Sequence, residues 1–241
     1  MADGTSIEWT EATWNPVTGC SKVSPGCAHC YAERLSLRFR TTQKPWLPEH
    51  AAENVVLHDA RLSQPLRWRR PRMVFVNSMS DLFHELVPLS FVRSVFEVMA
   101  EAEQHVFQVL TKRHERLLEL APELSWPSNL WIGVSIENRR WAERADYLRQ
   151  VPAAVRFVSA EPLLGPLDML ELEGIDWLIA GGESGPGHRP VRAEWIRDLR
   201  DRCDREGVAF FFKQWGGSRA KSGGRLLDGR EHSDFPARAA A

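Results

Sequence analysis

Three cysteines, Cys20, Cys27 and Cys30, are the residues of this sequence whose type and spacing most clearly predict chemistry. Thiolates are the soft ligands that hold iron–sulfur clusters and zinc in proteins. Two residues separate Cys27 from Cys30, so one tight turn can aim both sulfurs at a single centre. Pro25-Gly26 bends the chain so that Cys20 can return to the same place. Because small secreted proteins spread and pair their cysteines, this crowded segment of a 241-residue chain is predicted to bind metal instead.

Two kinds of metal site remain open for three thiolates. In a four-iron, four-sulfur cluster they hold three of the irons, and the fourth iron is left to bind a small molecule. The alternative is a structural zinc with His29 as its fourth ligand. His29 lies between two of the ligands in sequence, where its ring reaches their shared metal poorly, so the cluster is favoured. The remaining cysteine, Cys203, shares the apolar face of a predicted helix with Ile196 and Leu199 and is expected to be a core residue.

Short apolar runs rich in β-branched residues recur along the chain, with helical patterns between them. The runs cover residues 73–76, 106–110, 130–134, 155–158, 177–180 and 208–212, and residues 6–15 and 54–57 are earlier strand candidates. Continuous runs of this length are typical of strands that a parallel sheet buries on both faces. About six to eight strand–helix units predict an α/β fold, namely a complete or partial (β/α) barrel. A doubly wound open sheet is the rival architecture.

Composition and length set the domain organisation and the compartment. Residues 1–217 are predicted to form the barrel domain, with the cysteines in its N-terminal part, and residues 218–241 a flexible loop and a short C-terminal extension. No apolar run is long enough to span a membrane, and residues 1–9 lack the pattern of a signal peptide, so we expect a cytoplasmic protein. A net charge of -1 argues against a chain that coats nucleic acid with its whole surface.

Polar residues follow almost every predicted strand, and in a barrel these strand ends fall on the one face where active sites form. Such ends carry Lys112 and Arg113, then Ser135 to Asn138, and Glu161. Later ends carry Gly181 to Ser184, and Lys213 to Trp215. The structural alternative for Glu161 is a helix N-terminal carboxylate favoured by the helix dipole, and for Lys112 and Arg113 it is a solvated helix start. For Lys213 it is an ion pair with one of the strand-end carboxylates.

A cysteine triad after the first strand of a predicted barrel, with Tyr31 beside the last cysteine, resembles the radical S-adenosylmethionine superfamily. Residues 14–20, 24–33, 181–185 and 212–216 look like a phage- and bacterium-associated family of uncharacterised function that is described by its three-cysteine motif. The cysteine spacing differs from the usual superfamily pattern, because six residues separate the first two cysteines. The segment Gly181-Gly182-Glu183 also differs, because it follows a late strand rather than the second one.

The resemblance implies an enzyme with a radical-SAM-like barrel, a 4Fe-4S cluster and S-adenosylmethionine as cofactor. An electron donor would reduce the cluster, and a 5′-deoxyadenosyl radical would then abstract hydrogen from a substrate. On this basis Glu161 or Glu183 is expected to bind the cofactor's ammonium, and Lys112, Arg113 or Arg189 its carboxylate. The remaining residues expected at the cofactor are Ser135, Glu137 and Asn138 for the ribose, with Gly181, Gly182 and Ser184 close to the ligand.

A basic run with an aromatic residue inside it, Arg67-Trp68-Arg69-Arg70-Pro71-Arg72, points to a nucleic acid or nucleotide as substrate. The expected substrate contacts are Arg67, Trp68, Arg69, Arg189, Lys213, Gln214 and Trp215. A solvated loop before a strand is the alternative for the basic run. Two other functions stay open: a zinc-stabilised barrel that binds nucleic acid or protein without redox chemistry, and an iron–sulfur sensor.

Overall fold

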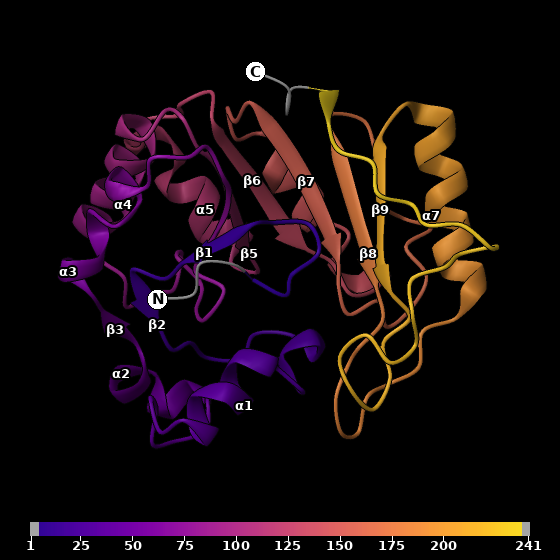
Figure 1. The fold of residues 1–241 in the computed structure, drawn as a ribbon, viewed down its shortest axis with the longest axis horizontal. Coiled ribbons are helices and arrows are strands. Elements are labelled where there is room, and N and C mark those ends of the chain that lie inside the picture. Colours follow the sequence, from indigo (N-terminus) through magenta and orange to yellow (C-terminus); the bar gives the residue numbers. More distant parts are fainter. Residues whose placement is uncertain (1–4, 238–241) are drawn as a thin grey trace. The chain divides into compact units, whose positions relative to one another are not determined.

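A computed structural model describes residues 5–237 of the chain (Figure 1). It contains two compact units, Met1–Ile132 with Val151–Ala154, and Gly133–Gln150 with Val155–Ala241. The predicted boundary between a barrel at 1–217 and an extension at 218–241 stays a prediction. The last four residues of that extension, and the first four of the chain, lie outside the described residues. No helix in the described part of the chain is long and apolar enough to cross a membrane.

One sheet holds seven of the strands found within residues 5–237, in the order β1-β4-β5-β6-β7-β8-β9. In the first unit, parallel pairing joins β1 (Ala12–Trp14), β4 (Met73–Val76) and β5 (Val106–Thr111). In the second unit it joins β7 (Val155–Ala160), β8 (Trp177–Gly181) and β9 (Ala209–Gln214). β6 (Leu130–Ser135) has residues in both units.

The order of these strands settles which of the two predicted architectures is present. The strands follow one another in chain order, without the reversal that defines a doubly wound sheet. β1 and β9 are the two ends of the order, so the predicted α/β barrel is confirmed in its partial form. Residues 54–57 are a wrong prediction of a barrel strand. There, β3 (Val56–Leu57) pairs antiparallel with β2 (Val17–Thr18) in a separate two-stranded sheet, and Val56 is exposed rather than buried on both faces.

Helices of the first unit either follow strands or line the path between β1 and β4. They are η1 (Pro25–Cys27), α1 (Tyr31–Arg38), η2 (Pro48–His50), α2 (Ala51–Asn54), α3 (Asp59–Leu62), η3 (Pro65–Arg67), α4 (Leu89–Glu101), α5 (His114–Leu120) and η4 (Ala121–Glu123). α4 buries the apolar residues that share its helical face, which are Phe91, Val92, Val95, Phe96 and Met99. This face packs into the core of the unit, as its periodicity predicts.

Helices of the second unit are η5 (Arg139–Trp141), α6 (Arg144–Arg149) and α7 (Ala193–Glu206). α7 buries Ile196, Leu199 and Cys203 and lies beside β9 (Figure 1). It ends at Gly207, whose left-handed φ of 70° suits a residue without a side chain. The predicted place of Cys203 in the core is confirmed, since its side chain is fully buried.

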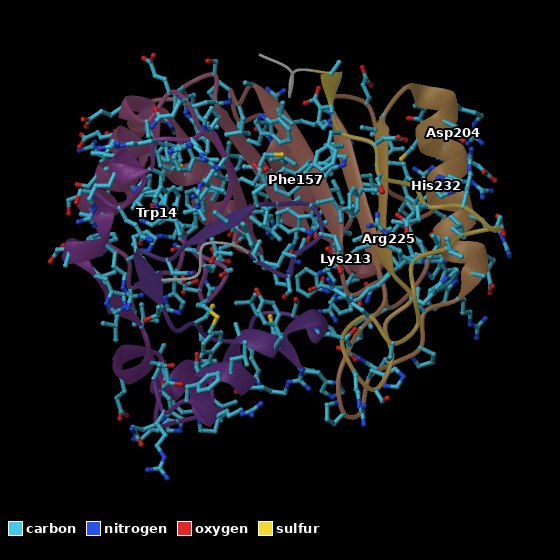
Figure 2. All side chains as sticks on the ribbon, in the orientation of Figure 1. Trp14, Phe157, Asp204, Lys213, Arg225 and His232 are labelled. Atoms are coloured by element: carbon cyan, nitrogen blue, oxygen red, sulfur yellow. The ribbon has the colours of Figure 1, made fainter. Side chains whose placement is uncertain are left out.

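Aromatic residues fill the core of each unit separately, and Figure 2 labels one of them in each. Trp14 on β1 lies 5.9 Å from Phe107 between ring centroids in the first unit. Phe157 on β7 lies 5.6 Å from Trp177 in the second. Phe157 and Trp177 lie on adjacent strands, whereas β4 separates the strands of Trp14 and Phe107. Packing of these large side chains helps to fix the strands whose ends carry the candidate site residues.

Candidate functional site

The three cysteines of the first unit follow β2 and precede or begin α1. Cys20 comes directly after Gly19, which has a φ of +83° and lies so close to Asn54 that a Cβ would meet its carbonyl oxygen at 1.8 Å. The Gly19 N–H donates to the Met79 carbonyl at 2.9 Å, which ties Cys20 to the loop after β4. Cys27 ends the 3-10 turn η1, and Cys30 is the residue before α1. Glycine at position 19 is therefore what lets the chain deliver Cys20 to this place.

A buried carboxylate holds the cysteine segment in position. Glu33 in the first turn of α1 accepts a hydrogen bond from the Trp46 backbone N–H at 2.8 Å and pairs with Lys22 at 2.9 Å. The Lys22 backbone N–H donates in turn to the Trp46 carbonyl at 3.0 Å. The two sides of the cysteine segment are thus joined to one another through the chain at Trp46.

Cys20, Cys27 and Cys30 are half-buried, and a negative charge on one thiol would act on the others. Burial raises the pKa of the Cys20 thiol to about 12, and negative charge on Cys27 or Cys30 adds to that rise. Burial also raises the pKa of Cys30, against the backbone N–H of Glu33, which points at its sulfur. Lys112 carries a positive charge that acts on Cys30. Thiolates gathered here need a cationic centre, and metal ions supply one.

The donor set fits an iron–sulfur cluster in its chemistry. Within residues 5–237, no three His, Cys, Asp or Glu side chains are arranged to hold a single metal ion. A four-iron cluster does not ask for such convergence, because each thiolate binds its own iron. N–H groups point at the sulfurs of Cys20 and Cys30, and cluster-bound sulfurs commonly accept hydrogen bonds from such groups.

Arg113, at the carboxyl end of β5, is buried beside Cys20. Its Nη1 lies 3.7 Å from the Cys20 Sγ, and its Nη2 donates to the carbonyl and the hydroxyl of Ser21 at 3.3 and 2.9 Å. Its Nε donates to the Glu85 carboxylate at 3.0 Å. From the sequence, Arg113 is expected as a partner for a cofactor carboxylate, with a solvated helix start as the alternative. That alternative is wrong for Arg113, because its side chain is buried. Its contact with the cysteine was missed, because no local pattern indicates it.

Asp81 joins the loop after β4 to the end of β5. Its carboxylate accepts hydrogen bonds from the Thr111 hydroxyl at 2.8 Å and from the Lys112 backbone N–H at 3.1 Å. It also lies 3.5 Å from Arg113. Burial by itself would lower the pKa of the Arg113 guanidinium, but the negative charges of Asp81, Cys20 and Glu85 outweigh it and raise that pKa. Arg113 is therefore a permanent cation beside the cysteines.

A histidine completes this network. The Leu86 backbone N–H donates to Nδ1 of His84 at 3.1 Å, so the proton of the neutral ring sits on Nε2. That Nε2 lies 2.9 Å from the Ser21 hydroxyl and donates to it. Burial lowers the pKa of His84, in keeping with a neutral ring. Ser21 thus accepts from His84 and Arg113 together, which fixes the residue after Cys20.

In the second unit, Glu183 and Arg189 form an ion pair. Glu183 is buried, and its Oε2 accepts from the backbone N–H and from Nε of Arg189 at 2.9 Å each, while Arg189 Nη2 reaches Oε1. The hydrogen bonds that Arg189 donates to Glu183 raise the pKa of Arg189. Both residues were expected at a ligand. The structure brings them together as partners of one another.

Glu161 and Lys213, at the ends of β7 and β9, also pair. Lys213 Nζ lies 3.1 Å from Glu161 Oε1, and the Ser159 hydroxyl donates to Glu161 Oε2 at 3.4 Å. Figure 2 marks Lys213 at the end of its strand. The alternative that Lys213 pairs with a strand-end carboxylate is confirmed. This pair is only partly buried, with side-chain exposures of 22% for Lys213 and 14% for Glu161, so it stays accessible to solutes.

The residues expected at a ribose lie at the end of β6. Glu137 is fully buried, and its Oε2 accepts from Arg144 Nη1 at 3.1 Å. The Ser135 carbonyl accepts from the same nitrogen at 2.6 Å. Asn138 begins η5, and its side-chain oxygen accepts from the Arg140 backbone N–H at 3.0 Å. Each of these residues thus has a structural task at the end of the strand.

Two glycine-rich segments of the second unit pair backbone to backbone. Gly182 donates to the Gln214 carbonyl at 2.9 Å, and the Gly217 N–H donates to the Glu183 carbonyl at 3.0 Å. A Cβ on Gly182 would meet the Trp215 carbonyl oxygen at 2.1 Å, so this contact explains its glycine. Ser184 pairs with Gly217 by a β-bridge, and its buried hydroxyl makes no hydrogen bond within residues 5–237.

The basic run of the first unit lies away from the cysteines. It precedes β4, whereas the loop that Cys20 contacts follows β4, so the two features flank opposite ends of that strand. Arg67 and Arg69 are exposed. The ring of Trp68 lies 5.6 Å from His105 and 5.3 Å from the Arg72 guanidinium. Trp68 therefore packs partly against its own unit, and Gln104 donates to its carbonyl at 3.2 Å.

Comparisons with known proteins give a family and two similar structures. Residues 4–236 match the family described as "Protein of unknown function (DUF5131)". No curated protein matches the sequence. A cysteine-to-serine mutant of spore photoproduct lyase is similar with a TM-score of 0.46 and 15% identity, covering 88% of this chain and 58% of that one. Spore photoproduct lyase complexed with dinucleoside spore photoproduct is similar with a TM-score of 0.41 and 14% identity, covering 78% and 59%. The chain spans less than two thirds of the length of either structure.

Proposed function

The chain belongs to the DUF5131 family, and we propose that it is an iron–sulfur enzyme of the radical S-adenosylmethionine kind. The observation that carries this proposal is the gathering of Cys20, Cys27 and Cys30 beside a buried arginine, at a loop joined to the carboxyl end of β4. A cluster bound there with one open iron would, once reduced, supply the single electron needed to cleave S-adenosylmethionine into methionine and a 5′-deoxyadenosyl radical.

Residues of the first unit, taken by itself, would hold the cluster and a carboxylate group. The three cysteines are the ligands, as thiolates. Lys112 is the proposed partner of the cofactor's carboxylate, because its charge already acts on Cys30 and its side chain is only half-buried. Arg113 is not assigned to the carboxylate, because all three of its nitrogens already have partners.

In the second unit, taken by itself, Glu161 is a stronger candidate than Glu183 for binding an ammonium group. Glu183 already accepts from the backbone and side chain of Arg189. The side chain of Glu161, which pairs with Lys213, is more exposed than that of Glu183. The Ser184 hydroxyl is a further candidate contact, since a buried hydroxyl without a partner in the protein is available to a ligand. The other proposed cofactor contacts are Ser135, Glu137, Asn138, Gly181 and Gly182.

A nucleic acid or nucleotide base is the proposed substrate class, and an electron donor for cluster reduction is the proposed partner. Exposed arginines of the basic run, Arg67 and Arg69, suit phosphate groups of a polymer at a distance from the cysteines, because the run precedes β4, and the partly exposed ring of Trp68 suits stacking. In the second unit, Arg189, Lys213, Gln214 and Trp215 are the proposed contacts. We place the activity in the cytoplasm, where thiols stay reduced.

The test is to purify the chain without oxygen and to measure iron, sulfide, zinc and visible absorption. We expect about four irons and four sulfides per chain, and colour from thiolate-bound iron. Cys27→Ala should abolish the cluster, and Cys203→Ala is the matched control that should retain it. Addition of dithionite and S-adenosylmethionine should then yield 5′-deoxyadenosine and methionine.

Two results would overturn the proposal. Colourless protein with about one zinc per chain after attempted reconstitution would leave a zinc-stabilised binding protein. A cluster that yields no 5′-deoxyadenosine after reduction with the cofactor would leave an iron–sulfur sensor. In either case the cysteines would still be metal ligands, but the proposal of radical chemistry would be rejected.

A further inference from the structure

We propose that Arg113 is a positioning residue that raises the reduction potential of the cluster through the sulfur of Cys20. The inference rests on the proposed function, because it needs a cluster on the three cysteines. It concerns a residue that touches a ligand sulfur rather than the reacting atoms. Arg113 reaches Cys20 from a distant strand end, 93 residues further along the chain.

The guanidinium of Arg113 is fixed in orientation. Nε donates to Glu85, Nη2 donates to Ser21, and Nη1 faces Cys20 Sγ at 3.7 Å and Asp81 at 3.5 Å. Because all three nitrogens of the planar guanidinium have partners, the group cannot rotate without breaking these contacts. The side chain is only 4% exposed, so water screens its charge poorly. The Nη1 N–H is therefore held toward the Cys20 sulfur.

The anions around Arg113 hold it in place without cancelling its effect at the sulfur. Asp81 is engaged by Thr111 and by the Lys112 backbone as well, and the Glu85 carboxylate is 60% exposed to solvent. Nη1, by contrast, points at Cys20 directly. A cation that donates an N–H to a ligand sulfur withdraws negative charge from it.

One-electron reduction adds a negative charge to the cluster and its thiolates, with no proton or bond change at the protein. In the test the electron comes from dithionite through redox mediators. A fixed cation beside Cys20 stabilises the more negative, reduced form, and so raises the potential. Replacing Arg113 by Gln removes the cation and leaves Asp81 and Glu85 uncompensated. Both effects disfavour reduction, by about tenfold in the equilibrium, or about 59 mV for one electron.

The experiment is a mediated redox titration of the reconstituted full-length protein, followed by the absorption and electron paramagnetic resonance of the cluster. We expect Arg113→Gln to lower the midpoint potential by about 59 mV and Arg113→Lys to lower it less, since Lys keeps the charge but not the fork. Arg116→Gln is the matched control, because Arg116 donates to the Val87 carbonyl and should leave the potential unchanged. An unchanged potential in Arg113→Gln with an intact cluster overturns the inference.

A second variant keeps the inference testable if Arg113→Gln does not bind a cluster. Glu85→Gln removes an exposed anion that pairs with Arg113, so the fold and the cluster should survive and the potential should rise. If Arg113→Gln cannot be loaded, a rise in Glu85→Gln together with a fall in Arg113→Lys supports the inference, and no change in both overturns it. Failure of the unaltered protein to bind a cluster would instead remove the proposed function, so the two failures are distinguishable.

Discussion

The backbone of Gly182 lies against that of Trp215, so closely that a Cβ on Gly182 would stand 2.1 Å from the Trp215 carbonyl oxygen. Gly216 stands in the same relation to Glu183, whose carbonyl oxygen a Cβ would meet at 2.2 Å. The two glycine-rich segments thus need glycine for their contact with each other. This contact places Glu183 and Ser184 at the end of β8.

Gly182→Ala should therefore destabilise the second unit by about 3 kcal/mol or more, because backbone atoms cannot make way as a flexible side chain does. Gly224→Ala is the control. Gly224 has a φ of +71° but no neighbour within 4 Å of its Cβ position, so its cost should be backbone strain alone, about 1 kcal/mol. Urea unfolding of both variants measures the difference. Equal costs in the two variants would contradict the close contact.

Glu137→Gln should destabilise the protein by about 3 to 5 kcal/mol, because it leaves the buried charge of Arg144 without its carboxylate partner. Glu194→Gln, which alters an exposed ion pair with Arg192, should cost less than about 1 kcal/mol. Replacing the buried pair together, Glu137→Leu with Arg144→Met, should recover much of the loss. Urea midpoints decide between this structural role and a purely ligand-binding one, for which Glu137→Gln would leave stability unchanged.

Local patterns in the sequence predict much of this fold. The apolar run at 106–110, for example, becomes the parallel strand β5 (Val106–Thr111), because a strand that a parallel sheet buries on both faces is apolar along its length. The periodic face of α7 correctly places Cys203 in the core. The exception is Val56–Leu57. This apolar stretch is only two residues long, and it forms a strand in a different sheet.

Pairing between distant side chains could not be predicted in the same way. Many cations follow strands in this sequence, and spacing does not say that Arg113 reaches Cys20. Which strand ends meet depends on register and on the loops between strands. The ion pair of Lys213 with Glu161 could only be named as an alternative, for the same reason.

Cys203 should resist thiol reagents in the folded protein, although it is a free cysteine. Burial raises the pKa of its thiol to about 12, so the reactive thiolate is scarce at neutral pH. After removal of metal, an alkylating reagent should modify Cys27, which is half-buried, well before Cys203. Peptide mass spectrometry over time measures the two rates, and equal rates in the folded state would contradict the burial. Cys203→Ala should cost only about 1 kcal/mol, since it removes one buried atom group.

Asp228 should stabilise the protein near neutral pH and lose that effect in acid. Hydrogen bonds from Arg197 and then from Arg200 lower the pKa of its carboxyl well below the ordinary 3.8. A carboxyl whose pKa is lowered by folding contributes stability above its unfolded pKa, and the contribution fades as the pH falls below 3.8. Asp228→Asn keeps a side chain that tolerates the left-handed backbone found here, so the charge is the main change.

The measurement is the melting temperature of Asp228→Asn and of the unaltered protein across this pH range. We expect Asp228→Asn to melt a few degrees lower near neutral pH, and the gap to narrow steadily below pH 3.8. Asp168→Asn is the control, because Asp168 pairs with one arginine, Arg139, at 3.2 Å, and its gap should be smaller at every pH. A gap for Asp228→Asn that stays constant down to the lowest pH would mean that its paired arginines do not hold the carboxyl in its charged form.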